Sequence, residues 1–198
     1  MIFTQNTKLK ASSTNGWTIF GFGLEPVRTC PFAGSCRRIC YARKGLYRTH
    51  LKACKARWDS NLALTKRPEG FTIIGDEISR LERNAIRRSK RLAIRIHTEG
   101  DFYDISYACS WIETARRFPN VLFYAYTKSH KMLSSIHHIP ANLNIIASEG
   151  GKHDALLSSW SGPVARVVDE YSGFNLQGSD DDKVAMLAKS GVVEIIKH

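Results

Sequence analysis

Three cysteines lie within eleven residues, at Cys30, Cys36 and Cys40, in a segment that also contains Pro31 and Gly34. Thiolates are soft ligands that favour zinc and iron–sulfur clusters. A structural zinc site takes four ligands, whereas three thiolates leave one position of an inorganic centre open for an incoming molecule. The spacing therefore predicts that the three side chains converge on one metal centre, and it favours an iron–sulfur cluster over zinc.

The other two cysteines have simpler interpretations. Cys54 falls on the same helical face as Trp58, and Cys109 falls on a stripe of apolar residues, so we expect both in the core. Cys54 or His50 could nevertheless complete a four-ligand zinc site beside the cysteine segment. A zinc site therefore remains the alternative to a cluster.

Length, charge and cysteine usage bound the class of protein. The chain has 198 residues and a net charge of +11, which fits one domain over residues 1–198 and favours anionic partners. No apolar run reaches the roughly 18 residues of a membrane span, and an odd, uneven set of cysteines argues against a secreted disulfide framework. We therefore expect a cytoplasmic protein without membrane contact, acting on an anionic small molecule or nucleotide-like substrate, with nucleic acid as a further candidate partner.

Apolar runs and helical periodicity alternate along the chain. The expected strands cover residues 17–22, 92–96, 121–126, 143–147, 164–168 and 192–196. The expected helices cover residues 51–62, 74–85, 105–115, 129–136, 154–160 and 181–189. Such alternation requires parallel strands with right-handed crossovers, which predicts an α/β fold; a doubly wound sheet and a partial barrel both fit. Residues 1–16 are polar and read as a loosely ordered segment, and residues 23–50 as the cysteine-bearing loop.

Polar side chains follow several expected strands at the point where each strand ends. Glu99 and Asp101 follow the second strand, Tyr126 and Lys128 the third, and Glu149 the fourth. The carboxyl ends of parallel strands form one rim, so we expect these residues to share a site with the cysteines. The four charged residues are the candidate catalytic groups, and the tyrosine is a candidate cofactor contact.

Two further features have competing interpretations. His97 could orient a cofactor or relay protons, or it could belong to the turn that Asp104 caps at the start of a helix. Several arginines share one face of the expected helix over 74–85 and its end, which predicts a solvated face or a nucleic-acid footprint. These are Arg80, Arg83, Arg87 and Arg88.

The order of motifs resembles a known family. Cys-x5-Cys-x3-Cys-Tyr-Ala, then Thr-Glu-Gly-Asp-Phe, then Tyr-Thr-Lys-Ser, resembles the phage-associated Gene product 88 family over about residues 17–147. That family is in turn similar to the radical S-adenosylmethionine superfamily. The resemblance implies a partial (β/α)6 barrel, like a partial TIM barrel, with parallel strands and outer helices. It also implies a [4Fe-4S] cluster on Cys30, Cys36 and Cys40, with S-adenosylmethionine on the open iron.

The resemblance also implies roles for individual residues. Ile39, just before the last cysteine, would lie near the adenine, and Tyr41 and Tyr126 would contact the cofactor. Glu99 and Gly100 would receive the methionine amino group. Such an enzyme requires an electron donor, and it would act in the host cytoplasm if the gene is phage-encoded.

Three functions follow from these patterns. The first is a radical S-adenosylmethionine-type enzyme, in which the cofactor supplies the hard chemistry. The second is an iron–sulfur enzyme whose open iron binds substrate directly, without S-adenosylmethionine, as in a lyase or a sulfur-handling enzyme. The third is not an enzyme: a zinc-stapled basic domain that binds nucleic acid through its arginine face.

Overall fold

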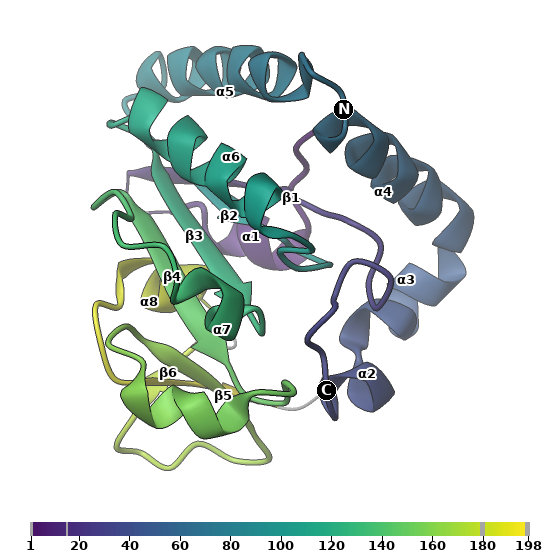
Figure 1. Ribbon diagram of the computed structural model, residues 1–198. Helices are drawn as coiled ribbons and strands as arrows, with labels where there is room; N and C mark the ends of the chain where they lie inside the picture. The colour runs from purple at the N-terminus through teal and green to yellow at the C-terminus, as the bar shows by residue number, and fades with distance from the viewer. Residues whose placement is uncertain (1, 15, 179–180, 197–198) are drawn as a thin grey trace.

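The structure, a computed structural model, describes residues 2–14, 16–178 and 181–196. Within these residues, seven parallel strands form one sheet in the order β1-β2-β3-β4-β5-β7-β6. The strands are β1 (Trp17–Phe22), β2 (Arg91–Ile96), β3 (Leu122–Thr127), β4 (Leu143–Ser148), β5 (Val164–Val168), β6 (Leu176–Gln177) and β7 (Val192–Ile196). The sheet curls into a half-barrel (Figure 1). The predicted α/β class with parallel strands is therefore confirmed, and the half-barrel replaces the doubly wound alternative.

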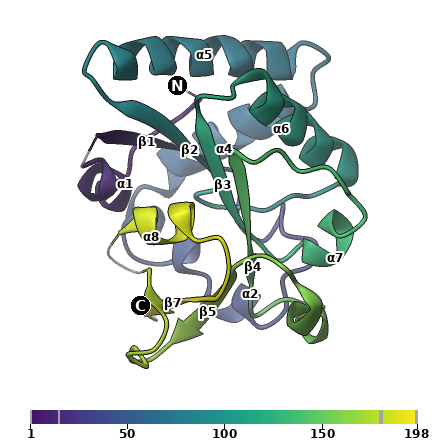
Figure 2. The same cartoon turned by 90° about the vertical axis from the view of Figure 1, so that its left-hand side faces the viewer.

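The helices lie on both faces of this sheet. They are α1 (Thr7–Ser12), α2 (Cys36–Ile39), α3 (Gly45–Thr49), α4 (Leu51–Thr65), α5 (Gly70–Ile86), α6 (Ile105–Arg117), α7 (His130–Leu133) and α8 (Asp182–Leu187), with 3-10 turns η1 (Tyr41–Arg43) and η2 (Asp154–Ser159). Figure 2 shows α1 and α8 on one side of the strands and α6 and α7 on the other. None of the described helices is both long enough and apolar enough to cross a membrane.

The outer face carries the larger core. Strand residues such as Ile94 and Phe123 pack there against Ile74 and Ile78 of α5 and Trp111 of α6, and all five side chains are fully buried. Burying such side chains contributes roughly 1.5–3 kcal/mol each. This core holds the strands in place, so that the loops after them come together at one end.

The inner face is filled by two short helices from opposite ends of the sequence. Leu9 of α1 and Met186 of α8 are fully buried against Ile19, Tyr124 and Ile146 of the strands. These helices cover the amino-terminal part of the inner face and leave its carboxyl end open. The open end is where the loops after the strands gather.

The structure differs from the sequence-based expectation at several elements. All six expected strands are present, but the two-residue β6 was missed because it is exposed and has no apolar run. The segment expected to be loosely ordered contains α1, whose N-cap Asn6 accepts a hydrogen bond from the backbone of Leu9 at 2.9 Å. The expected helix over 154–160 is the 3-10 turn η2. Cys109 is exposed rather than in the core, because the buried stripe of α6 runs through its neighbour Ala108.

Candidate cofactor site

A cavity of about 560 Å³ opens at the carboxyl ends of the strands. Its wall contains the three expected cluster ligands and all the expected cofactor contacts and catalytic groups, but not His50 or Cys54, the candidate fourth zinc ligands. The residues in the wall are Cys30, Cys36, Ile39, Cys40, Tyr41, Glu99, Gly100, Asp101, Tyr126, Lys128 and Glu149. The strand order explains this gathering, because the loops after β1, β2, β3 and β4 are neighbours along one rim. A volume of this size is typical of a small-molecule or cofactor site.

The cysteine segment is fastened to the loop after β4. The backbone amides of Gly34 and Cys36 donate to the carbonyl of Gly150 at 2.9 and 3.2 Å, and Ala33 forms an isolated antiparallel bridge with Gly151. A Cβ atom on Gly34 would lie 2.7 Å from the Gly151 carbonyl oxygen, so only glycine fits. Gly150 and Gly151 therefore allow the cysteine segment to approach their backbone closely.

The three thiols are free and partly buried, and all three cysteines line this cavity. Cys30 lies in the loop, Cys36 begins α2 and Cys40 follows it. Across residues 2–14, 16–178 and 181–196, no three His, Cys, Asp or Glu side chains lie close enough to hold one metal ion. The structure thus brings the three cysteines to one cavity, and their convergence on one metal centre stays a prediction.

The protonation of the thiols follows from their surroundings. Burial and then the nearby carboxylate of Asp101 raise the pKa of Cys30 to about 12. Burial also raises the pKa of Cys40, and the cations of Arg43 and Lys128 oppose that shift. Lys128 is therefore a positive charge placed where it favours a thiolate.

Glu99 lies at the bottom of the cavity and ties α4 to the loop after β2. Its buried carboxylate accepts hydrogen bonds from the indole of Trp58 at 3.0 Å and from the hydroxyl of Thr98 at 2.9 Å, and it pairs with Arg57 at 3.4 Å. Gly100 follows with φ +85°, and a side chain there would lie 2.7 Å from the Cβ of Leu24. These contacts give both residues a structural function beside the predicted cofactor contact.

Asp101 joins the loops after β2 and β3. Its carboxylate accepts from the Thr127 hydroxyl at 2.6 Å, and from the backbone amides of Lys128 and Phe102 at 2.8 Å each. Burial raises the pKa of Asp101, and these hydrogen bonds oppose the shift. The arrangement positions Lys128, whose ammonium group donates to Ser148 at the end of the adjacent strand β4 at 2.9 Å.

The remaining predicted residues lie on the rim. Glu149 pairs with Arg166 at 2.8 Å, so it fixes the neighbouring strand as well as facing the cavity. Ile39 is 43% exposed and Tyr41 is 46% exposed. The Tyr41 hydroxyl donates to the carbonyl of Thr98, which draws the segment after the cysteines onto the end of β2.

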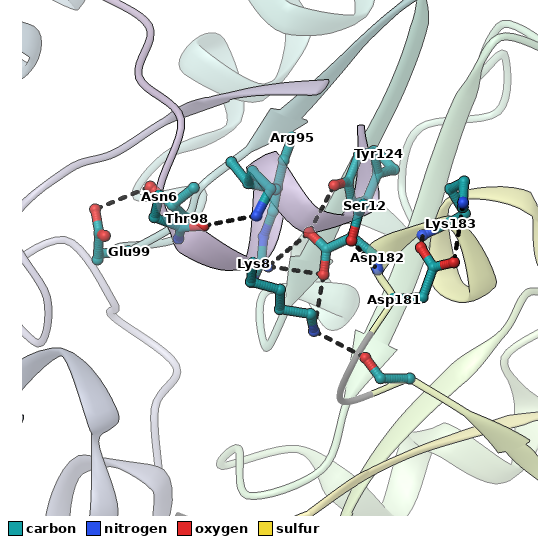
Figure 3. Close-up of polar contacts among 12 residues, drawn as sticks. Asn6, Lys8, Ser12, Arg95, Thr98, Glu99, Tyr124, Asp181, Asp182 and Lys183 are labelled. Carbon is teal, nitrogen blue, oxygen red and sulfur yellow. Dashed lines mark hydrogen bonds and ion pairs between the residues drawn. The ribbon is translucent and has the colours of Figure 1, made fainter. Parts of the chain in front are cut away.

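A buried charge network that no sequence pattern indicated lies around Asp182 (Figure 3). The carboxylate of Asp182, at the start of α8, accepts from Arg95 at 3.0 Å, from Lys8 at 2.8 Å and from the Tyr124 hydroxyl at 2.7 Å. Burial alone would raise the pKa of Asp182, but Arg95 and Lys8 outweigh it and hold that pKa at about 2. Arg95 also lies over the ring of Tyr126, 4.9 Å from its centroid.

His97 is a structural residue rather than a proton relay at neutral pH. Its ring is buried, shares a hydrogen bond of 2.8 Å with the Tyr107 hydroxyl and packs edge-on against Phe102. Burial, and then the charge of Arg95, lower the pKa of His97 to about 3. The imidazole is therefore neutral under ordinary conditions.

Comparison with known proteins gives one family. The family model described as Gene product 88 matches residues 1–194 of this chain. The chain belongs to the Gene product 88 family. The expected family is thus confirmed, by a match that extends well beyond the motifs that suggested it.

Two curated relatives are phage proteins. The Gene 88 protein of Mycobacterium phage L5 is 29% identical over 107 residues, which cover 50% of this chain and 43% of the phage protein. The Gene 88 protein of Mycobacterium phage D29 is 27% identical over 107 residues, which cover 50% and 42%. The matched part is therefore less than half of either relative. No solved structure is significantly similar to this chain.

Proposed function

We propose that this Gene product 88 protein holds a [4Fe-4S] cluster through Cys30, Cys36 and Cys40, and that it binds S-adenosylmethionine beside the cluster as a radical enzyme. The single observation that carries the proposal is that three free thiols line one cavity of about 560 Å³ at the open end of a half-barrel. When bound, the cofactor pair supplies one-electron cleavage and hydrogen-atom abstraction, which no side chain can supply.

The donor set fits a cluster better than a zinc ion. A single zinc ion requires four donors at about 2.0–2.3 Å from one point, and no described group of side chains approaches that arrangement. A cluster instead takes each thiolate on a different iron, so its sulfur ligands need not meet at a point. Three half-buried thiols spread over the wall of one cavity suit that geometry.

The other residues of the cavity would hold and shield the cofactors. Lys128 places a positive charge near Cys40, which favours the thiolate that a metal requires. Asp101 keeps the Lys128 backbone in position, and Ile39 places an apolar side chain at the rim, where it would limit access of water. Glu99 and Gly100 line the same cavity, and they are the residues proposed to contact the methionine amino group.

The cellular setting follows from the same chemistry. A cluster of this kind needs an external electron donor and thiols that stay reduced, so we place the protein in the cytoplasm. All five cysteines are free in the described structure. The substrate that we propose is anionic, in keeping with the net charge of +11.

The first test is anaerobic reconstitution with iron and sulfide. We expect about four iron and four sulfide per chain, with a brown colour, in the wild type. The variant Cys36→Ala should lose most of this content, whereas the matched control Cys54→Ala should keep it, because Cys54 lies outside the cavity wall. One zinc per chain without iron would instead support the zinc-stapled nucleic-acid-binding alternative.

The second test separates the two cluster enzymes. Reconstituted protein is incubated with S-adenosylmethionine and dithionite, and 5′-deoxyadenosine is measured. Its release, absent in Cys36→Ala, would support the radical enzyme. A loaded cluster without that product would favour the enzyme that offers its open iron directly to substrate.

A further inference from the structure

A second cavity of about 580 Å³ adjoins the cofactor cavity. We call it the side chamber; it lies between the N-terminal segment with α1 and the segment from α3 to α4. Its lining includes Lys8, Lys10, Tyr47, Arg57, Glu99 and Tyr126. Tyr41, Arg95 and Tyr126 belong to the walls of both cavities, so a ligand in the side chamber would border the cofactor cavity.

The side chamber is basic. Lys8, Lys10, Arg57 and Arg95 line it, and among the residues that the structure describes Glu99 is the one carboxylate in its lining. Asp182, which is not a lining residue, neutralises part of this charge through its ion pairs with Lys8 and Arg95 (Figure 3). Four cations against two carboxylates leave an excess of positive charge, which favours an anionic ligand.

Three donors on the wall of the side chamber lack an acceptor. The Nε groups of Arg57 and Arg95 and the hydroxyl of Tyr126 are buried, and they have no hydrogen-bond partner within the described part of the protein. Leaving a buried donor unpaired costs about 1–3 kcal/mol, so such groups are uncommon unless a ligand completes them. Two guanidinium groups and a phenol together match the oxygens of a phosphate or a carboxylate.

An aromatic surface lies beside these donors. The ring of Tyr47 is stacked on Trp58, with centroids 6.3 Å apart and planes inclined by 20°. Tyr41 meets the same ring edge-on at 5.8 Å. Rings held in this way offer a flat surface on which a nucleobase can stack.

We propose that the side chamber binds a nucleotide, with its phosphate on Arg57, Arg95 and Tyr126 and its base against Tyr47. Naming that nucleotide the substrate rests on the proposed function, because it would lie next to the cofactor cavity. The binding itself does not depend on a cluster. It can therefore be measured on protein without metal.

The probes are AMP, GMP, CMP and UMP, compared with the four matching nucleosides by calorimetry and by quenching of tryptophan fluorescence. We expect at least one nucleotide to bind at least tenfold more tightly than its nucleoside, with an affinity that falls as salt rises. Arg57→Gln and Tyr47→Leu should each weaken that binding about tenfold, and the exposed Lys10→Ala should weaken it several-fold. The matched charge control is Arg88→Gln, on an exposed position after α5, and it should leave the affinity unchanged.

Each outcome decides between supporting and overturning the inference. Equal affinity for nucleotide and nucleoside, no binding of any nucleotide, or binding of a single-stranded oligonucleotide alone would overturn it. If Arg57→Gln does not fold, judged by circular dichroism, the effect of Lys10→Ala decides. Nucleotide binding in protein that takes up no iron would overturn the proposed function and leave this inference standing; iron uptake without nucleotide binding would do the reverse.

Discussion

The residues that the sequence identifies as candidate catalytic or cofactor-binding groups also have structural roles. Glu99 accepts hydrogen bonds from Trp58 of α4 and from Thr98. Asp101 accepts them from Thr127 and Lys128 at the end of β3, and both carboxylates are buried. Substituting either would therefore disturb the cavity wall as well as any chemistry. His97 differs from them, because burial lowers its pKa and keeps the imidazole neutral at ordinary pH.

The pKa of His97 makes a prediction about acid stability. That pKa is about 3 in the folded chain and about 6.5 in an unfolded chain, so between these values the unfolded state binds a proton that the folded state does not. The resulting stability is complete above about pH 6.5 and declines as pH falls toward 3, with a loss of about 2 kcal/mol by pH 5. His97→Gln should remove this decline, measured as urea midpoints at pH 7.5 and 5.

The control for this experiment is another histidine. His137 is exposed on the loop after α7, and His137→Gln should keep the pH dependence of the wild type. Parallel pH profiles for wild type and His97→Gln would show that the buried imidazole is not the cause.

At the scale of elements, the strands were predictable because they are apolar on both faces. Ile94 and Ala93 pack into different cores on opposite faces of the same strand, so residues 92–94 of β2 form a continuous apolar run. The same strands then placed the cysteine segment and the later loops at one rim. The gathering of these residues in one cavity could be read from strand order alone.

Other elements depend on contacts that a sequence does not display. α1 has one buried apolar side chain, Leu9, in a polar segment, and only the inner face of the sheet explains why it is a helix. The Arg95–Asp182 pair joins residues 87 positions apart. Neither position has a motif around it, so the network and the side chamber above it could not be predicted.

The contact between the cysteine segment and the loop after β4 makes a prediction at this scale. Gly34→Ala would place a methyl group 2.7 Å from the Gly151 carbonyl and push the two segments apart. We expect iron content after reconstitution to fall at least several-fold, while the melting temperature changes by only a few degrees, because the core is untouched. Ser35→Ala is the control, because Ser35 is the next residue and its hydroxyl makes no helix-capping hydrogen bond to α2. Equal iron content in the two variants would contradict the prediction.

At the scale of the whole molecule, one carboxylate joins both ends of the described chain to the middle of the sheet. Asp182 is paired with Lys8, with Arg95 on β2 and with Tyr124 on β3, and its backbone amide donates to Ser12 at 2.9 Å. Removing one partner of a buried charge pair leaves the other charge uncompensated.

Asp182→Asn should therefore destabilise the protein by about 3–5 kcal/mol. The neighbouring Asp181 is a suitable control, because its side chain is 40% exposed and its hydrogen bond is to the backbone of Lys183. Asp181→Asn should cost about 1 kcal/mol or less. Thermal unfolding followed by circular dichroism measures both, and equal losses would show that the buried network contributes no more than an ordinary helix cap.

The ion pair between Lys8 and Asp182 also has a consequence for folding during synthesis on the ribosome. The two residues are separated by most of the sequence, so α1 emerges long before α8 can join it. Until then, apolar residues such as Ile19 and Ile146 lack their cover, and a nascent chain would expose them to chaperones. The inner face is therefore completed only after α8 has emerged, and a pause in translation before residue 182 would prolong the exposure of these residues.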